Sequence, residues 1–99
     1  MYFVIIGEDV VDSLPLRLSV RPAHLARLEL LRAENRLLLA GPFPLSEEST
    51  DAPTGFSGSL IVADFPTLAD CQSWANADPY VQAGVYARVT IKPFRKVMP

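Results

Sequence analysis

The side chain of this sequence best suited to move protons near neutral pH is its one histidine, His24. It lies in the stretch RLSVRPAHLARLELL, residues 17–31, two residues after Pro22. Such a histidine can act as a general acid or base. It can also pack at the start of a helix and hydrogen-bond a carbonyl. In a first helical turn, the positive end of the helix dipole would favour neutral imidazole, a proton acceptor.

Six further residues are candidates for substrate binding: Ser19, Arg21, Gly41, Pro42, Ser59 and Tyr80. Arg21 could clamp a substrate carboxylate or phenolate, with Ser19 beside it, or it could be a solvated arginine. The pair Gly41–Pro42 could let a ligand approach the backbone, or it could end a strand. Ser59 and Tyr80 could line a pocket, or they could serve in surface or core packing.

Metal and cofactor sites have no signature in the sequence. One histidine and one cysteine cannot build the usual Cys/His zinc site within one chain. Cys71 lies among helix-forming residues and is expected to be a buried apolar filler, and Trp74 is expected in the core. There is no Gly-rich phosphate loop and no GxSxG elbow. We therefore expect no metal and no cofactor, and any catalysis would be proton chemistry by side chains.

Composition predicts one folded domain spanning residues 1–99. Hydrophobic residues make up 49% of the chain and charged residues 20%. The net charge is −2 and the basic residues are spread out, which argues against nucleic acid and against an anionic membrane. The N-terminal apolar run is too short to span a bilayer and lacks a signal-peptide pattern, so a cytoplasmic protein is expected.

The elements that must position His24 follow from the apolar periodicity. We expect a helix of roughly four turns from Pro22, with His24 and Leu28 on one stripe and Arg27 towards water. A second helix opens at the capping box of Thr67 and ends near Asp78. Strands are expected at 2–6, 37–43, 56–65 and 85–91, and irregular segments at 8–20 and 44–55.

The resulting order is βαββαβ, an α+β ferredoxin-like fold with a four-stranded antiparallel sheet and both helices on one face. The last strand alternates, which places Tyr86 on the face opposite Val89. The other three strands are apolar on both sides, although two helices can cover only one face of a sheet. A second copy of the chain is the simplest cover for the other face, so we expect a homodimer with its sheets face to face.

Several motifs together resemble the YciI-like family of small bacterial proteins along essentially the whole chain: RLSVRPAHLARLELL, RLLLAGPFP, GFSGSLIVADF, WANADPYVQAGVY and VTIKPFRKV. The resemblance implies the dimeric α+β barrel fold. It also implies kinship with dehydrochlorinases that act on chlorinated hydroxyhydroquinones through a proposed His–Asp pair. The matching residues are His24, in RPAH, and Asp78, in ADPY. The substrate does not carry over, because relatives on one fold differ in substrate.

Asp78 has two interpretations. It could be a helix-terminal residue that accepts hydrogen bonds from backbone N–H groups, or it could orient His24. Our hypothesis is a small cofactor-independent enzyme in which His24 is the general acid/base and Asp78 orients it. Its reaction would be an elimination, as in the dehydrochlorinases, or an isomerisation of a small substrate, aromatic ones included. The alternative is a non-catalytic ligand-binding or scaffold dimer in which His24 is structural.

Overall fold

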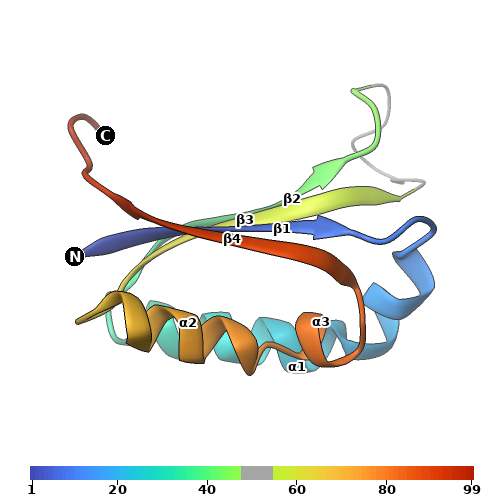
Figure 1. Ribbon diagram of the computed structural model, residues 1–99, viewed down its shortest axis with the longest axis horizontal. Coiled ribbons are helices and arrows are strands. Elements are labelled where there is room, and N and C mark those ends of the chain that lie inside the picture. The colour runs from blue at the N-terminus through green and yellow to red at the C-terminus, as the bar shows by residue number, and fades with distance from the viewer. Residues whose placement is uncertain (48–54) are drawn as a thin grey trace.

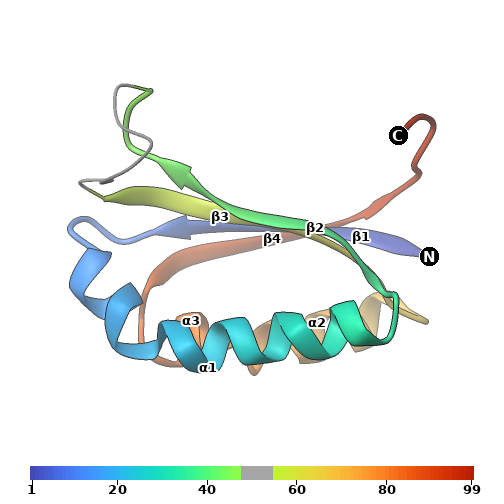
Figure 2. The same cartoon turned by 180° about the vertical axis from the view of Figure 1, so that it is seen from behind.

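The computed structural model describes residues 1–47 and 55–99. Its elements are β1 (Tyr2–Asp9), α1 (Leu14–Ala33), β2 (Leu37–Pro44), β3 (Phe56–Asp64), α2 (Leu68–Asn76), α3 (Pro79–Gln82) and β4 (Tyr86–Phe94). The strands form one antiparallel sheet in the order β2-β3-β1-β4, with the helices on one face (Figures 1 and 2). The predicted ferredoxin-like α+β fold is confirmed. Most of the predicted irregular segment 44–55 lies outside the described residues.

The helix α1 begins earlier than the sequence suggested. Residues 14–20, expected to be irregular, form its first turns, and Pro22 lies inside the helix. Pro15, rather than Pro22, occupies the first turn, where a missing N–H costs no hydrogen bond. His24 therefore lies near the middle of a helix of 20 residues. The helix-dipole argument for neutral imidazole fails, since that effect fades beyond the first turn.

The core lies between the sheet and the helices. Residues of β1 and β3 that point towards the helices pack against one stripe of α1 and against α2, and Cys71 is fully buried there, as predicted. The predicted start of the second helix at Thr67 is also confirmed, because the Thr67 hydroxyl caps α2 by accepting from the Asp70 N–H at 3.1 Å. Trp74 packs against this core, as expected. Helix α1 also packs directly against α3, which brings the middle of α1 beside the start of α3.

The opposite face of the sheet is covered by none of the three helices of the described chain (Figures 1 and 2). Strand register places the pairs Val4–Val62 and Ile6–Leu60 on it, and Leu39 lies beside Val62. Leu39 is 48% exposed, as an apolar side chain on an open sheet face would be. The predicted apolar second face is therefore present in the described chain.

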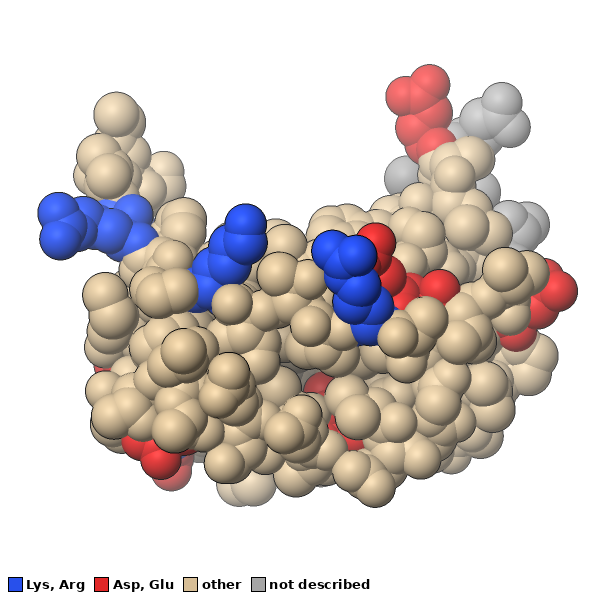
Figure 3. Space-filling view, in the orientation of Figure 1, with Lys and Arg blue, Asp and Glu red and all other residues tan. Residues whose placement is uncertain are grey.

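Two further properties bear on partners. No helix of the described chain is long and apolar enough to cross a membrane. On the face shown in Figure 3, lysine and arginine side chains form separate spots rather than one basic patch.

Candidate active site

His24 and Asp78 are in direct contact. The His24 Nδ1 lies 2.8 Å from Asp78 Oδ1 and 3.1 Å from Asp78 Oδ2. Both side chains are almost fully buried, with 7% and 3% of their surfaces exposed. The two residues are 54 positions apart in sequence, one on α1 and the other at the start of α3. The fold therefore builds an imidazole–carboxylate pair between two elements that pack side by side.

Asp78 makes the contacts that each of its two interpretations requires. Its backbone is extended, and its Oδ1 accepts a hydrogen bond of 2.8 Å from the Tyr80 N–H, which caps α3. Pro79 follows at a position where its missing N–H costs nothing. The cap fixes the carboxylate, and the fixed carboxylate orients the imidazole of His24. Structural and orienting functions thus reside in the same two oxygens.

This arrangement selects one tautomer of the histidine. An ionised carboxylate only accepts hydrogen bonds, so Nδ1 carries the proton that lies between His24 and Asp78. In neutral imidazole the lone pair then resides on Nε2. No protein partner for Nε2 lies among the described residues, and His24 lines a cavity. The pair therefore offers a proton acceptor to whatever occupies that cavity.

The imidazole is also held by its face. The rings of His24 and Tyr80 stack in parallel, with centroids 3.8 Å apart and planes 6° apart. On Tyr80 lies the guanidinium of Arg17, 5.0 Å from the ring centroid. Burial raises the pKa of the Tyr80 phenol, and the charges of Arg17 and Arg21 oppose that rise. Tyr80 was considered either a pocket residue or a packing residue, and it is both.

Arg17 is a site residue that the sequence did not reveal. It binds Asp9 through two hydrogen bonds, Nε to Oδ2 at 2.6 Å and Nη2 to Oδ1 at 2.9 Å. Its Nη2 also donates to the Ser59 hydroxyl at 2.8 Å, and the Ser13 hydroxyl donates to Asp9 at 2.5 Å. Burial lowers the pKa of Arg17, but the hydrogen bonds and the charge of Asp9 outweigh it and leave that pKa raised. This buried network joins β1, α1 and β3 beside the His24–Tyr80 stack.

The sequence did contain a signal for Arg17. Arg17, Arg21, His24 and Leu28 are spaced by four, three and four residues, the pattern of one helix face. The expected irregular segment 8–20 hid this stripe, because it placed Arg17 outside the helix. Once α1 is seen to begin at Leu14, the whole stripe faces the sheet.

Arg27 was expected to point towards water, and this expectation is wrong. Its guanidinium lies 4.3 Å from the centroid of the Trp74 ring, and its Nη2 donates to the Trp74 carbonyl at 2.7 Å. Its Nη1 is buried without a hydrogen-bond partner. Burial lowers the pKa of Arg27, and the charge of Asp78 opposes that change. Arg27 thus adds positive charge behind the His24–Asp78 pair.

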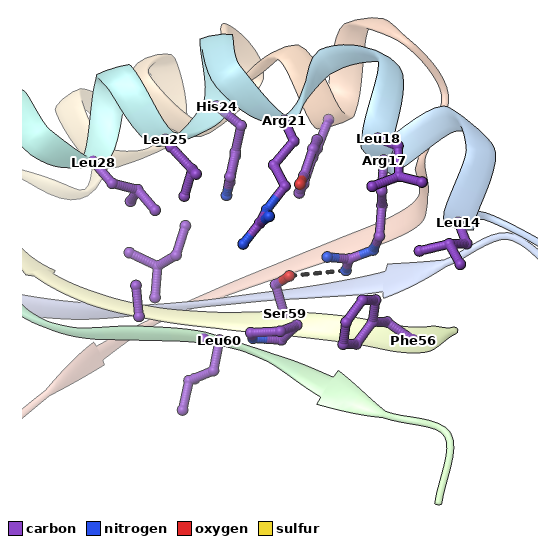
Figure 4. A pocket seen from close by; sticks show the side chains of 15 residues that line it. Leu14, Arg17, Leu18, Arg21, His24, Leu25, Leu28, Phe56, Ser59 and Leu60 are labelled. Carbon is purple, nitrogen blue, oxygen red and sulfur yellow. Dashed lines mark hydrogen bonds between the residues drawn. The ribbon is translucent and has the colours of Figure 1, made fainter. Parts of the chain in front are cut away.

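A cavity of about 610 Å³ lies between α1 and the strands β2 and β3, a volume suited to a small organic molecule (Figure 4). Its polar lining comes from Arg17, Arg21, His24, Ser59 and Tyr80, and its walls are mainly apolar side chains. In Figure 4 the arginines and the imidazole enter it from α1, while Ser59 faces them from β3. Four of these polar side chains are buried and Arg21 alone is exposed, and burial strengthens the electrostatic effect of the four.

The structure brings most of the candidate site residues together. Arg21, His24, Gly41, Pro42, Ser59 and Tyr80 all line the cavity, and Asp78 lies behind His24. Ser19 does not line it: this side chain is exposed, and its hydroxyl donates to the Leu16 carbonyl at 2.6 Å. The prediction for Ser19 fails because α1 begins earlier than expected, which places Ser19 on the exposed face of the helix. Within the described residues, no three His, Cys, Asp or Glu side chains gather as a possible metal site.

Comparison with known proteins gives three kinds of match. A model of the YCII-related domain family matches residues 1–95. Protein YciI of Escherichia coli O6:H1 is 56% identical over 97 residues, covering 98% of this chain and 99% of that protein. Protein YciI of Shigella flexneri matches equally well. An uncharacterized protein of Haemophilus influenzae is 52% identical over 97 residues, again covering 98% of this chain and 99% of that protein.

Among solved structures, the chain is similar to 5-chloro-2-hydroxyhydroquinone dehydrochlorinase from Burkholderia phenoliruptrix AC1100, in complex with 2,5-dihydroxybenzoquinone. The TM-score is 0.86 at 28% sequence identity, over 96% of this chain and 94% of the other. The two proteins therefore share their fold from end to end.

Proposed function

The chain belongs to the YCII-related domain family, and from that premise we propose that it is a small enzyme in which His24 and Asp78 perform acid–base chemistry. The observation that supports this proposal most strongly is the 2.8 Å contact between His24 Nδ1 and Asp78 Oδ1 beside an apolar cavity. A histidine that only packs would not need a buried carboxylate. An unpaired carboxylate at that depth would be costly, so the pair is maintained as a unit.

The proposed reaction begins with proton removal from a carbon next to a carbonyl or from a phenol. Nε2 of His24 takes the proton, and Asp78 stabilises the imidazolium that results. In an elimination, the electron pair of the broken C–H bond forms a C=C bond while a leaving group departs as an anion from the neighbouring carbon, and the imidazolium then releases its proton to solvent. In an isomerisation, the imidazolium returns the proton to a different carbon. Both routes use only side chains of this protein.

The structural relative supports the elimination in particular. That relative is a dehydrochlorinase, and its ligand is a planar, oxygen-substituted ring. A cavity of about 610 Å³ with apolar walls suits a substrate of that size in this chain. We propose a small planar substrate that carries a carbonyl or phenol, without assigning the relative's own substrate to this protein.

Deuterium exchange tests the proposal whatever the leaving group is, because it reports proton removal alone. The protein would be incubated in D₂O with a panel of hydroxyquinols and cyclic ketones, and exchange at carbon would be followed by proton NMR. The wild-type protein is expected to accelerate exchange of at least one compound. His24→Asn should abolish the acceleration, and Asp78→Asn should reduce it about 10²- to 10⁴-fold, the usual contribution of one acid–base group.

A matched control is Asp70→Asn, since Asp70 is exposed and lies in the capping box of α2, away from the cavity. It should leave exchange unchanged. If His24→Asn exchanges deuterium as fast as the wild type, His24 is not the base. That result, with the cavity still binding ligands, would favour the alternative of a binding protein.

The proposal includes a homodimer with the sheets face to face. The open face of the sheet carries Val4, Ile6, Leu60 and Val62, with Leu39 at its edge strand. An identical face is the partner that such a surface fits, because two copies would shield each other by one two-fold contact. The cavity lies on the helix side, so each protomer would keep its own His24–Asp78 pair.

A further inference from the structure

Arg21 differs from the other arginines of α1. Among the described residues, Arg17 binds Asp9, Arg27 binds the Trp74 carbonyl and Arg32 binds Glu29 at 3.2 Å. The guanidinium of Arg21 has no hydrogen-bond or ion-pair partner in the described chain, and yet its side chain lines the cavity. Figure 4 shows it leaving α1 between His24 and Arg17 and extending towards Ser59. Arg21 is exposed as well as lining the cavity, so its guanidinium is accessible to a ligand that enters from solvent.

The cavity provides nothing to neutralise this charge. No carboxylate is among the lining residues. The two nearby carboxylates already have partners, since Asp9 accepts from Arg17 and Ser13, and Asp78 accepts from His24 and the Tyr80 N–H. The Arg21 charge also acts inside the cavity, because it opposes the rise in the pKa of Tyr80. The site therefore has one cation for which the described residues supply no counter-charge.

We propose that Arg21 is the anion-binding residue of this cavity and that the substrate is a small planar carboxylate. A guanidinium presents two parallel N–H donors that match the two oxygens of a carboxylate. The apolar walls on the cavity side would strengthen such a pair once a bound substrate displaces water from them. Arg17 is less suited to this role, since its charge is already paired with Asp9 and its Nε and Nη2 donate to Asp9 and Ser59. The inference rests on the proposed function for the identity of the site and goes beyond it in naming the substrate class.

The spacing along α1 also sets the distance between the anion and the reacting atom. Arg21 and His24 are three residues apart, so they are neighbours on one helix face, with Cβ atoms about 5–6 Å apart. A carboxylate at Arg21 would hold the substrate so that a carbon or hydroxyl one ring-width away meets Nε2 of His24. The binding group and the reacting group would therefore belong to one small molecule, such as an aromatic or unsaturated acid.

Binding of benzoate and benzamide tests this proposal, because the two probes have nearly the same shape and differ in charge. Their affinities would be measured by NMR titration of the backbone amide signals of the full-length protein. Wild type should bind benzoate at least about tenfold more tightly than benzamide, as expected for a charged hydrogen-bonded pair. Added salt should reduce this preference. Arg21→Met should abolish it, and Arg21→Lys should restore part of it.

Two further variants make the result specific. Arg32→Met removes an exposed arginine from the same helix and should leave the preference intact. Arg88→Met, which removes an exposed arginine from β4, outside the cavity, should also keep it. An Arg21→Met protein that still prefers benzoate, or a wild type that binds both probes equally or neither, would overturn the proposal.

The deuterium-exchange experiment separates this inference from the proposed function. Arg21-dependent benzoate binding without any His24-dependent exchange would retain the anion site and reject the enzyme. His24-dependent exchange with no effect of Arg21→Met on probe preference would retain the enzyme and reject the anion site.

Discussion

His24 and Tyr80 lie face to face, with their ring planes 6° apart and their centroids 3.8 Å apart. Tyr80 follows Asp78 by two residues, and its own N–H donates to the Asp78 carboxylate. One short segment, the first turn of α3, thus holds the imidazole by its edge through Asp78 and by its face through Tyr80. The orientation of His24 is therefore fixed in two directions by residues that move together.

Replacing Tyr80 by leucine should release the imidazole. Tyr80→Leu removes the stacking surface from a residue that is 3% exposed, and a single destabilising substitution typically costs about 0.5–3 kcal/mol. We expect a loss of His24-dependent exchange that exceeds any loss of folded protein, measured with deuterium exchange and urea denaturation side by side. Tyr80→Phe keeps the ring and is the control. If the leucine variant is as active as the phenylalanine variant, the stack does not position His24.

The Arg17–Asp9 pair should be essential as a pair and replaceable as a whole. Their side chains are 5% and 1% exposed. Arg17→Met leaves the Asp9 carboxylate buried without its main partner and should destabilise the fold by about 3–5 kcal/mol. The double variant Arg17→Met/Asp9→Leu removes both charges and should recover a large part of that loss.

Chemical denaturation followed by circular dichroism would measure these changes. Arg32→Met provides the comparison, because Arg32 and Glu29 are both exposed and such pairs contribute at most about 1 kcal/mol. A double variant less stable than Arg17→Met would contradict the idea that the unpaired carboxylate is the source of the cost.

These relationships also mark what the sequence could predict and what it could not. The βαββαβ order follows from apolar periodicity, which is local information. The contact of His24 with Asp78 spans 54 residues, and only the resemblance to a known family indicated it. Arg17 was missed because turn-forming residues at 12–15 suggested an irregular segment. The buried bonds of Arg17 to Asp9 and Ser59 are tertiary contacts that help to hold this part of the chain as helix.

Tyr86 shows how one irregularity defeats a periodic prediction. The register of β1 and β4 shifts between Glu8 and Asp9, so Tyr86 turns to the helix side rather than the side opposite Val89. Its ring lies on Gly7, where an added Cβ would come within 2.5 Å of it, and it contacts Tyr80 edge-on. A bulge of this kind leaves no mark in the alternation of apolar and polar residues.

The buried hydroxyl of Tyr86 should make the stability of the fold depend on pH. Burial raises the pKa of Tyr86 to about 12 from an ordinary 10.0. Between these two values the folded protein keeps a proton that the unfolded chain has lost. The free energy of unfolding should therefore fall as pH rises through this range, by up to about 1.4 kcal/mol per pH unit from this residue.

Tyr86→Phe isolates this contribution. At neutral pH the variant should be as stable as the wild type or more stable by up to about 1 kcal/mol, because a buried hydroxyl without a partner is removed. Its advantage should widen above pH 10, as measured by urea denaturation at several pH values. A constant difference across the alkaline range would show that the Tyr86 hydroxyl is not the titrating group.

The open sheet face should respond to charge if two copies meet there. Leu39 lies on β2 beside Val62 and is 48% exposed in a single chain. Leu39→Lys would place a charge in each half of a two-fold contact, and burying it without a partner costs several kcal/mol. Sedimentation at micromolar concentration should therefore give a dimer for the wild type and a monomer for the variant, with dimer affinity reduced at least about a hundredfold. The His24 cavity, on the other face, should keep its ligand-induced NMR shifts.

Leu30→Lys is the matched control for this dimer experiment, since Leu30 is 68% exposed on α1 and lies outside both the cavity and the open face. A wild type that sediments as a monomer, or a Leu39→Lys protein that stays dimeric, would mean that another surface or no surface joins two copies.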